Sequence, residues 1–154
     1  KAFGSFGAFV AGSRDVIDLI LQRARSYIYT TAIPPAVAAA TRAALAIAKQ
    51  DNWRRERLAA HVTRFRAGAL QRGLPVMASN SAIQPLVLPG GARCVAISRA
   101  LMERGFWVSA IRHPTVPAGT ERLRVTLSAG HSESQIEGLL DALHECVQLH
   151  PVEP

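Results

Sequence analysis

Hydrophobic residues recur at helical spacing in much of the first fifty residues. They predict a helix over residues 13–24 and a second over 36–49. Two prolines at 34–35 suit the start of the second helix, where a missing N–H is tolerated. Residues 1–12 are glycine-rich, and the β-type pair Phe9 and Val10 predicts that this loop leads into a short strand.

The hydrophobic pattern after residue 50 changes several times between helical and strand periods. A helix is expected from Asp51 to Gly73, and a capping box of Ser132 and Gln135 predicts the start of the last helix. The elements expected between them are a strand over 81–88, a helix over 92–104, and strands over 106–111 and 122–127.

This order of elements predicts the fold class, which is α/β with a small mixed or antiparallel sheet. Residues 1–48 hold too little sheet to form a domain, so we expect them to be the end of a larger domain. Residues 49–154 are expected to form a small α/β domain of their own. The chain also begins at a lysine within glycine-rich sequence, and we expect it to be part of a longer protein.

Composition and charge narrow the classes of protein. No apolar run is long enough to cross a bilayer, so a membrane protein is not expected. Cys94 and Cys146 stand far apart and predict buried, reduced thiols of a cytoplasmic protein. No metal-ligand spacing is present, so we expect no metal site.

The formal net charge is +7, and the basic residues include a cluster at residues 54–66. Such a cluster raises the possibility of a basic module that binds nucleic acid or another anion. No aromatic residues alternate with these arginines, as a stacking platform for bases requires. A solvated helix face is therefore the preferred interpretation, and we expect no nucleic-acid partner.

Four segments stand out for chemistry: KAFGSFGAFVAG at 1–12, YTTAIPP at 29–35, SAIQPLVL at 81–88 and IRHPTVPAGTERLRVTL at 111–127. Each alone is compatible with an ordinary loop or strand. Together and in this order they resemble the α-oxoamine synthases, a family of fold-type I pyridoxal-phosphate (PLP) enzymes. The resemblance implies that residues 1–48 are the C-terminal remnant of a large PLP-binding domain and that 49–154 form the small C-terminal domain.

The resemblance also implies the cofactor site. Lys1 matches the Schiff-base lysine, which becomes a general base once an amino acid displaces it; such a role requires an amine with a lowered pKa. Thr30 and Thr31 match the residues that reach the cofactor phosphate of the partner subunit. The implied enzyme is a homodimer with a shared active site, which this chain alone would leave incomplete.

The substrate residues lie in the last of the four segments. Arg124 matches the arginine that grips the α-carboxylate of the amino acid, for which a guanidinium offers a planar fork. Period-two spacing puts Arg122 on the same face, so spacing alone does not choose between the two. Thr115 matches a substrate-contacting threonine, and Arg112 is a candidate for the acyl substrate. His113 stands where proline is expected in biotin-pathway members.

The implied reaction is a decarboxylative condensation of an amino acid with an acyl thioester. The loop and strand sequences most resemble the branch of biotin biosynthesis, which joins L-alanine to pimeloyl-coenzyme A or pimeloyl-acyl carrier protein. The sequence leaves the acyl carrier open. Three other branches of the family remain alternatives: 5-aminolevulinate synthase, glycine C-acetyltransferase and serine palmitoyltransferase.

Overall fold

The computed structural model describes residues 3–151, and its contacts divide the chain into two compact units, 1–52 and 53–154. Among the described residues, no helix is both long and apolar enough to cross a membrane.

The first unit contains three helices, α1 (Arg14–Arg23), α2 (Arg25–Ile28) and α3 (Pro35–Gln50). The two predicted helices are confirmed, and Pro35 is the first residue of α3. The short strand predicted at Phe9 and Val10 is wrong, because the described part of this unit has no strand. A strand requires a hydrogen-bonded neighbour, and no other segment between residues 3 and 52 provides one.

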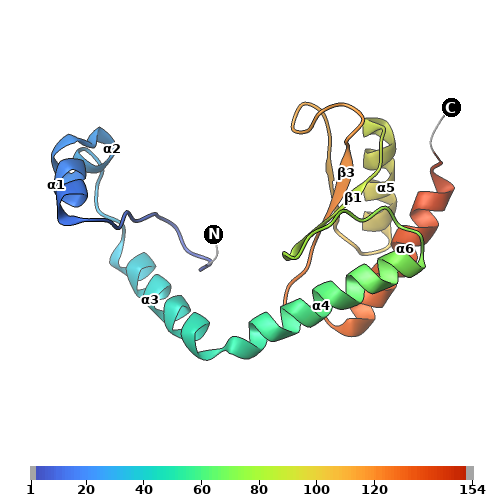
Figure 1. Cartoon of the computed structure of the whole chain (residues 1–154), viewed down its shortest axis with the longest axis horizontal. Helices are drawn as coiled ribbons and strands as arrows, with labels where there is room; N and C mark the ends of the chain where they lie inside the picture. The colour runs from blue at the N-terminus through green and yellow to red at the C-terminus, as the bar shows by residue number, and fades with distance from the viewer. Residues whose placement is uncertain (1–2, 152–154) are drawn as a thin grey trace. The chain divides into compact units, whose positions relative to one another are not determined.

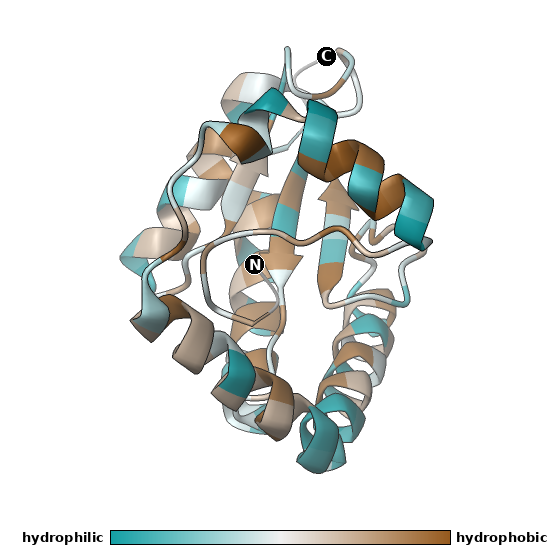
Figure 2. Cartoon of the chain, turned by 90° about the vertical axis from the view of Figure 1, so that its left-hand side faces the viewer, coloured by the Kyte–Doolittle hydropathy of each residue, from teal (hydrophilic) through white to brown (hydrophobic). Residues whose placement is uncertain are grey.

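Hydrophobic side chains of the first unit remain largely exposed. None of the residues in α1, α2 and α3 is buried, and Phe9 is 87% exposed. Figure 2, which turns this unit toward the viewer, shows hydrophobic positions on the outside of its helices. Between residues 3 and 52, this unit therefore has helices but no buried hydrophobic core.

The second unit is a three-stranded sheet with helices, shown in Figure 1. Its strands β1 (Ile83–Val87), β2 (Ser109–Ile111) and β3 (Arg122–Thr126) are antiparallel in the order β1-β3-β2. The predicted α/β class with a small sheet is confirmed. The helices are α4 (Asn52–Gln71), which begins at the boundary residue of the first unit, α5 (Gly91–Glu103) and α6 (Glu133–Leu149).

One hydrophobic core joins the sheet to these helices. Alternate residues of β3, Leu123 and Val125, point into it, as strand periodicity requires. The predicted capping box at the start of α6 is confirmed, with the Gln135 N–H donating to Ser132 Oγ at 3.2 Å. Both cysteines are free and buried, as expected. Helical core residues include Val62, Phe65, Ala69, Cys94, Ile97, Leu101, Ile136, Leu140, Leu143 and Cys146.

Strand β2 is shorter than predicted, because it begins at Ser109 rather than at Phe106. Its ladder with β3 starts at the pair Ser109–Arg124. The carbonyl of Val108 instead accepts a hydrogen bond from Ser98 Oγ at 2.6 Å, which ties this residue to α5. The extended segment before β2 is therefore held by a helix and not by a strand.

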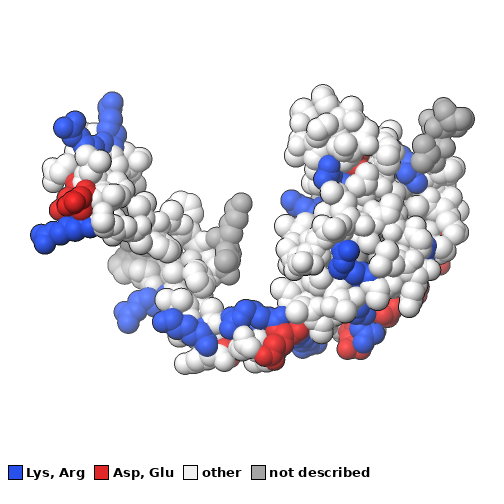
Figure 3. Space-filling view, viewed as in Figure 1, with Lys and Arg blue, Asp and Glu red and all other residues white. Residues whose placement is uncertain are grey.

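The basic cluster at residues 54–66 was predicted to be a solvated helix face, but two of its arginines contact other parts of the second unit. Arg64 forms ion pairs with Glu133 and Glu137 of α6. Arg66 donates to the carbonyl of Met77 at 2.7 Å. Figure 3 shows positive and negative side chains interleaved where α4 and α6 lie. The charge of Arg64 is thus balanced within the chain, because the tertiary fold brings acidic residues of α6 beside α4.

Candidate active site

The outer face of the small sheet presents two arginines on its central strand. In β3, Arg122 and Arg124 alternate with buried residues, so both side chains leave on the face opposite to the core. The register places Arg124 between Pro85 of β1 and Ser109 of β2. The predicted common face of the two arginines is confirmed.

The side chains of these two arginines differ in their hydrogen-bond partners. Arg122 is half-buried; its Nε donates to the carbonyl of Thr120 at 2.9 Å, and its Nη1 lies 3.6 Å from the sulfur of Met77. The side chain of Arg124 is exposed and makes no hydrogen bond or ion pair with any residue between 3 and 151. Its guanidinium fork is therefore available to an external carboxylate.

A loop over residues 112–121 leads into this strand. The N–H of Thr115 donates to the carbonyl of Arg112 at 2.9 Å, and the N–H of Thr120 donates to that of Pro117 at 3.1 Å. The side chains of Arg112 and Thr115 are exposed and have no hydrogen-bonded partner in the described part of the chain. Arg112 and Thr115 therefore lie on this loop, and Arg122 and Arg124 lie on the strand that directly follows it.

Glu121, which the sequence analysis did not select, lies at the end of this loop. Its carboxylate is buried, with 6% of the residue exposed, and its Oε2 accepts a hydrogen bond from the N–H of Gly90 at 3.3 Å. The signal was present in the sequence, because period-two spacing puts residue 121 on the buried face with Leu123 and Val125. An acid on that face requires a partner.

Hydrogen bonds set the ionisation of this acid. The pKa of Glu121 is lowered chiefly by its own backbone N–H, and the N–H groups of Gly90 and Gly119 and the charge of His113 act in the same direction. Desolvation by burial raises the pKa of this carboxyl, but its effect is smaller than the combined lowering. The carboxylate at the start of α5 is therefore held in its charged form at neutral pH.

The cofactor residues predicted from the sequence belong to the first unit. Lys1 lies outside the described residues. Thr30 and Thr31 line a pocket together with residues 5–8 and 32–33 and parts of α1 and α2. The hydroxyl of Thr30 donates to the carbonyl of Ser26 at 2.5 Å.

Thr31 differs from its neighbour in having free donors. Neither its hydroxyl nor its N–H makes a hydrogen bond with a residue in the described range 3–151. The N-terminal segment at Ser5 is tied to α3, because Thr41 Oγ1 donates to Ser5 Oγ at 2.9 Å. The pocket therefore combines an anchored N-terminal segment with polar donors at its rim.

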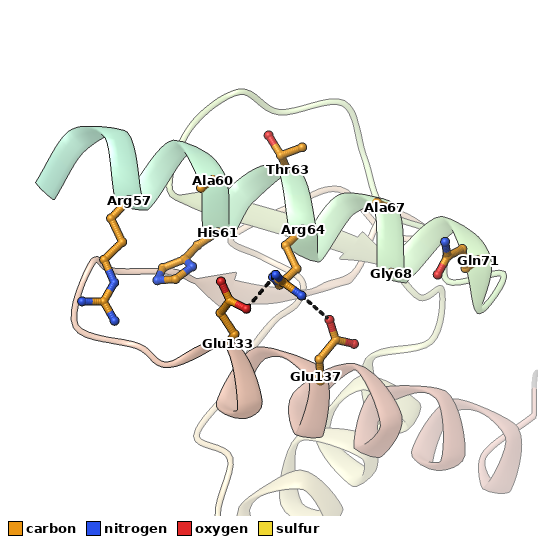
Figure 4. A pocket seen from close by; sticks show the side chains of 10 residues that line it. All are labelled: Arg57, Ala60, His61, Thr63, Arg64, Ala67, Gly68, Gln71, Glu133 and Glu137. Carbon is orange, nitrogen blue, oxygen red and sulfur yellow. Dashed lines mark hydrogen bonds and ion pairs between the residues drawn. The ribbon is translucent and has the colours of Figure 1, made fainter. Parts of the chain in front are cut away.

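A second polar pocket lies between α4 and α6, away from the predicted site residues, and is shown in Figure 4. Arg64 bridges Glu133 and Glu137 there, and Arg57 extends beside His61. His61 is 3% exposed, and its Nε2 has no hydrogen-bond partner in the described structure. The pocket mixes two arginines with two carboxylates, so it does not favour one charge of ligand.

No group of three or more His, Cys, Asp or Glu side chains that could hold a metal ion occurs among residues 3–151. The chemistry of the described residues is instead that of anion recognition, by arginine forks and by hydroxyl and N–H donors.

Comparison with known proteins assigns the class. Residues 1–143 match the family model of class I and II aminotransferases, so the chain belongs to this family. The match includes both units, and it extends from Lys1 through the loop and strand that carry the arginines.

The most specific similarities are to proteins named 8-amino-7-oxononanoate synthase. The protein of Saccharophagus degradans is 55% identical over 148 residues, covering 96% of this chain and 37% of the relative. That of Methylococcus capsulatus is 58% identical over 147 residues, covering 96% and 38%. The resemblance seen in the sequence is confirmed. The chain spans less than two fifths of the length of these curated relatives.

Solved structures agree with this fold. The 8-amino-7-oxononanoate synthase of Francisella tularensis matches with a TM-score of 0.85 and 29% identity, over 97% of this chain and 44% of that one. Serine palmitoyltransferase of Sphingomonas wittichii matches with a TM-score of 0.89 and 27% identity, over 97% and 38%. Another serine palmitoyltransferase structure, with a TM-score of 0.89 and 26% identity over 97% and 38%, contains PLP.

Proposed function

We propose that this chain is the C-terminal part of a PLP-dependent acyltransferase that condenses L-alanine with a pimeloyl thioester to give 8-amino-7-oxononanoate. The observation that carries the proposal is the identity of 55% to a relative named for this product, over 96% of the chain. The free fork of Arg124 on the central strand supports it, because the reaction requires recognition of an amino-acid carboxylate.

The described residues fit the cofactor. The unpartnered hydroxyl and N–H of Thr31 suit a phosphate, whose oxygens accept hydrogen bonds. When bound, PLP supplies an electron sink that stabilises negative charge on the carbon beside the amino group. Lys1 would hold the cofactor and then remove the proton from that carbon. Thr30 and Thr31 would hold the phosphate of the partner subunit's cofactor.

The substrates would meet the second unit. Arg124 would bind the carboxylate of L-alanine through two parallel N–H···O bonds. Thr115 and Arg112, exposed on the loop before this strand, would contact the substrate and orient the acyl thioester. We further propose that residues 1–48 complete a large cofactor-binding domain, that 49–154 form the small C-terminal domain, and that the full-length protein is a cytoplasmic homodimer with a shared active site.

The test of this function is a comparison of Arg124→Ala with Arg104→Ala in the full-length protein. Arg104 is an exposed arginine that follows α5 and pairs with Glu145, away from the proposed site, so it controls for loss of a surface charge. Hydrogen bonds between charged groups contribute about 1.5–3 kcal/mol, so KM for L-alanine should rise by about 10- to 100-fold in Arg124→Ala. KM for the thioester should change far less. An equal loss for both substrates would contradict the role of Arg124.

The same assay separates the alternatives within the family. L-alanine, glycine and L-serine are offered in turn with pimeloyl-coenzyme A, acetyl-coenzyme A, succinyl-coenzyme A and palmitoyl-coenzyme A. Selective turnover of L-alanine with the pimeloyl thioester supports the proposal. Selective turnover of glycine or L-serine would assign the protein to another branch.

Replacing Lys1 by Ala tests its role directly. We expect this variant of the full-length protein to lose the visible absorbance band that a lysine-linked cofactor gives, and to lose turnover, because no other amine replaces the lysine. Lys49→Ala is the control, since it removes the other lysine of the chain from the end of α3. An unchanged spectrum in Lys1→Ala would show that a different residue holds the cofactor.

A further inference from the structure

We propose that Glu121 is a positioning residue that fixes the loop over 112–120 and thereby places Arg112 and Thr115 for the acyl substrate. The substrate part of this inference rests on the proposed function. The part that concerns the loop rests on geometry within the second unit alone.

The carboxylate of Glu121 anchors the C-terminal end of the loop. Its Oε2 accepts a hydrogen bond from the N–H of Gly90 at 3.3 Å, and its backbone carbonyl accepts one from the N–H of Leu88 at 2.8 Å. Gly90 immediately precedes α5, so the carboxylate lies at the N-terminus of a 13-residue helix, where negative charge is favoured. One residue therefore ties the loop to the end of β1 and to the start of α5.

The N-terminal end of the loop reaches the same corner. A Cβ atom built on Gly91 would lie 3.7 Å from Cβ and 3.8 Å from Cδ of Arg112, which is ordinary van der Waals contact. Arg112 therefore lies next to Gly91, while Glu121 bonds to Gly90. Both ends of the loop converge on two adjacent residues.

Loss of the Glu121 side chain removes the bond to Gly90, while the backbone bond from the N–H of Leu88 to the carbonyl of residue 121 remains. The hydrogen bonds inside the loop are short-range, such as Thr115 N–H to Arg112 carbonyl, and they do not hold the loop to the rest of the unit. The N–H of Gly90 would also lose its acceptor. We therefore expect the loop to become mobile while β3, which has neighbours on both sides, keeps Arg124 in place.

The experiment uses four variants of the full-length protein, and its first readout is tryptic cleavage after Arg112. Glu121→Ala removes the carboxylate, Glu121→Asp withdraws it from Gly90, and Glu121→Gln keeps an oxygen that can accept the same bond. Glu103→Ala is the control, because Glu103 is an exposed acid of α5 with no partner in the described structure. The lost bond has a charged acceptor, so cleavage should accelerate about tenfold in Glu121→Ala. Glu121→Asp and Glu121→Gln should be intermediate, because the first withdraws the carboxylate and the second keeps the bond without its charge. Glu103→Ala should resemble the unaltered protein.

The second readout is the kinetic split between substrates. In Glu121→Ala, KM for the pimeloyl thioester should rise more than KM for L-alanine, because the loop moves and the strand does not. Glu121→Gln should recover part of the rise in the thioester KM, because it keeps the hydrogen bond without the charge. If Glu121→Ala does not fold, Glu121→Asp carries both readouts.

The cleavage readout tests the anchoring of the loop, and the kinetic readout tests its role in placing the substrate, so each can be contradicted independently. Unchanged cleavage after Arg112 in the folded Ala and Asp variants would overturn the anchoring, whatever the protein catalyses. Faster cleavage with an equal or absent change in both KM values would overturn the role in placing the substrate. If the full-length protein turns over another substrate pair, the cleavage result still decides the anchoring, and the proposed function alone is lost.

Discussion

At the scale of single residues, two adjacent glycines at the start of α5, Gly90 and Gly91, differ in why a glycine is present. Gly90 has φ of 101°, a backbone conformation that residues with a side chain rarely adopt. Gly91 is the first residue of α5, and a Cβ there would only touch Arg112 at 3.7 Å. The first glycine is required by the backbone, whereas the second is replaceable.

This difference predicts opposite outcomes for two similar substitutions. Gly90→Ala should destabilise the protein by about 1–3 kcal/mol, because the alanine must adopt a strained conformation or distort the corner. Gly91→Ala should be neutral or stabilising by up to about 1 kcal/mol, since alanine is the better helix former. The midpoints of thermal unfolding of the two variants measure this. A midpoint for Gly90→Ala equal to that of Gly91→Ala would show that the corner is not strained.

At the scale of elements, helices α4 and α6 approach closely at Gly68. A Cβ built there would lie only 2.4 Å from Cδ1 of Leu140, a fully buried residue of α6. Ion pairs line the same junction, where Arg72 binds Asp141 at 2.7 Å. Because partly exposed ion pairs contribute little, the close packing is the stronger determinant of this junction.

We therefore expect Gly68→Ala to destabilise the protein despite its better helix propensity. The propensity gain is about 1 kcal/mol. Overpacking against Leu140 costs about 1–3 kcal/mol, so the cost should prevail. Leu140→Val shortens the opposing side chain and should recover part of the loss in the double variant. Thermal unfolding of the two single variants and the double variant measures this coupling, and strictly additive effects would contradict it.

At the scale of the whole molecule, the two units differ in how completely they fold upon themselves. The second unit buries one core, whereas α1, α2 and α3 of the first unit have no buried residue. The hydrophobic side chains of the first unit therefore require other protein surface to cover them. This agrees with a chain that spans less than two fifths of its curated relatives.

Mixing two inactive variants tests whether the active site is shared between subunits. One full-length variant carries Lys1→Ala, and the other carries Thr30→Ala with Thr31→Ala. If the threonines serve the partner's cofactor, a mixed dimer contains one site in which both the lysine and the threonines are intact. Activity should then recover when the two proteins are unfolded and refolded together, relative to each refolded alone. No recovery, with mixed dimers demonstrated by mass, would place the threonines and the lysine of one site in the same subunit.

The sequence by itself determined the helices after Ser13 and Asp51, the order of elements in the second unit and the cap of α6. Each of these depends on local periodicity, on proline, or on side chains that bond to neighbouring backbone. It also determined that Arg122 and Arg124 share a face, since strand geometry alternates side chains.

The tertiary structure decided what depends on residues far apart in the chain. It removed the strand expected at Phe9, since strands require a neighbour, and it shortened β2 because Val108 bonds to α5. It distinguished Arg124 from Arg122 by the partners that only the latter has. It also brought Glu121 to Gly90, 31 positions earlier in the chain, by a hydrogen bond that no local pattern specifies.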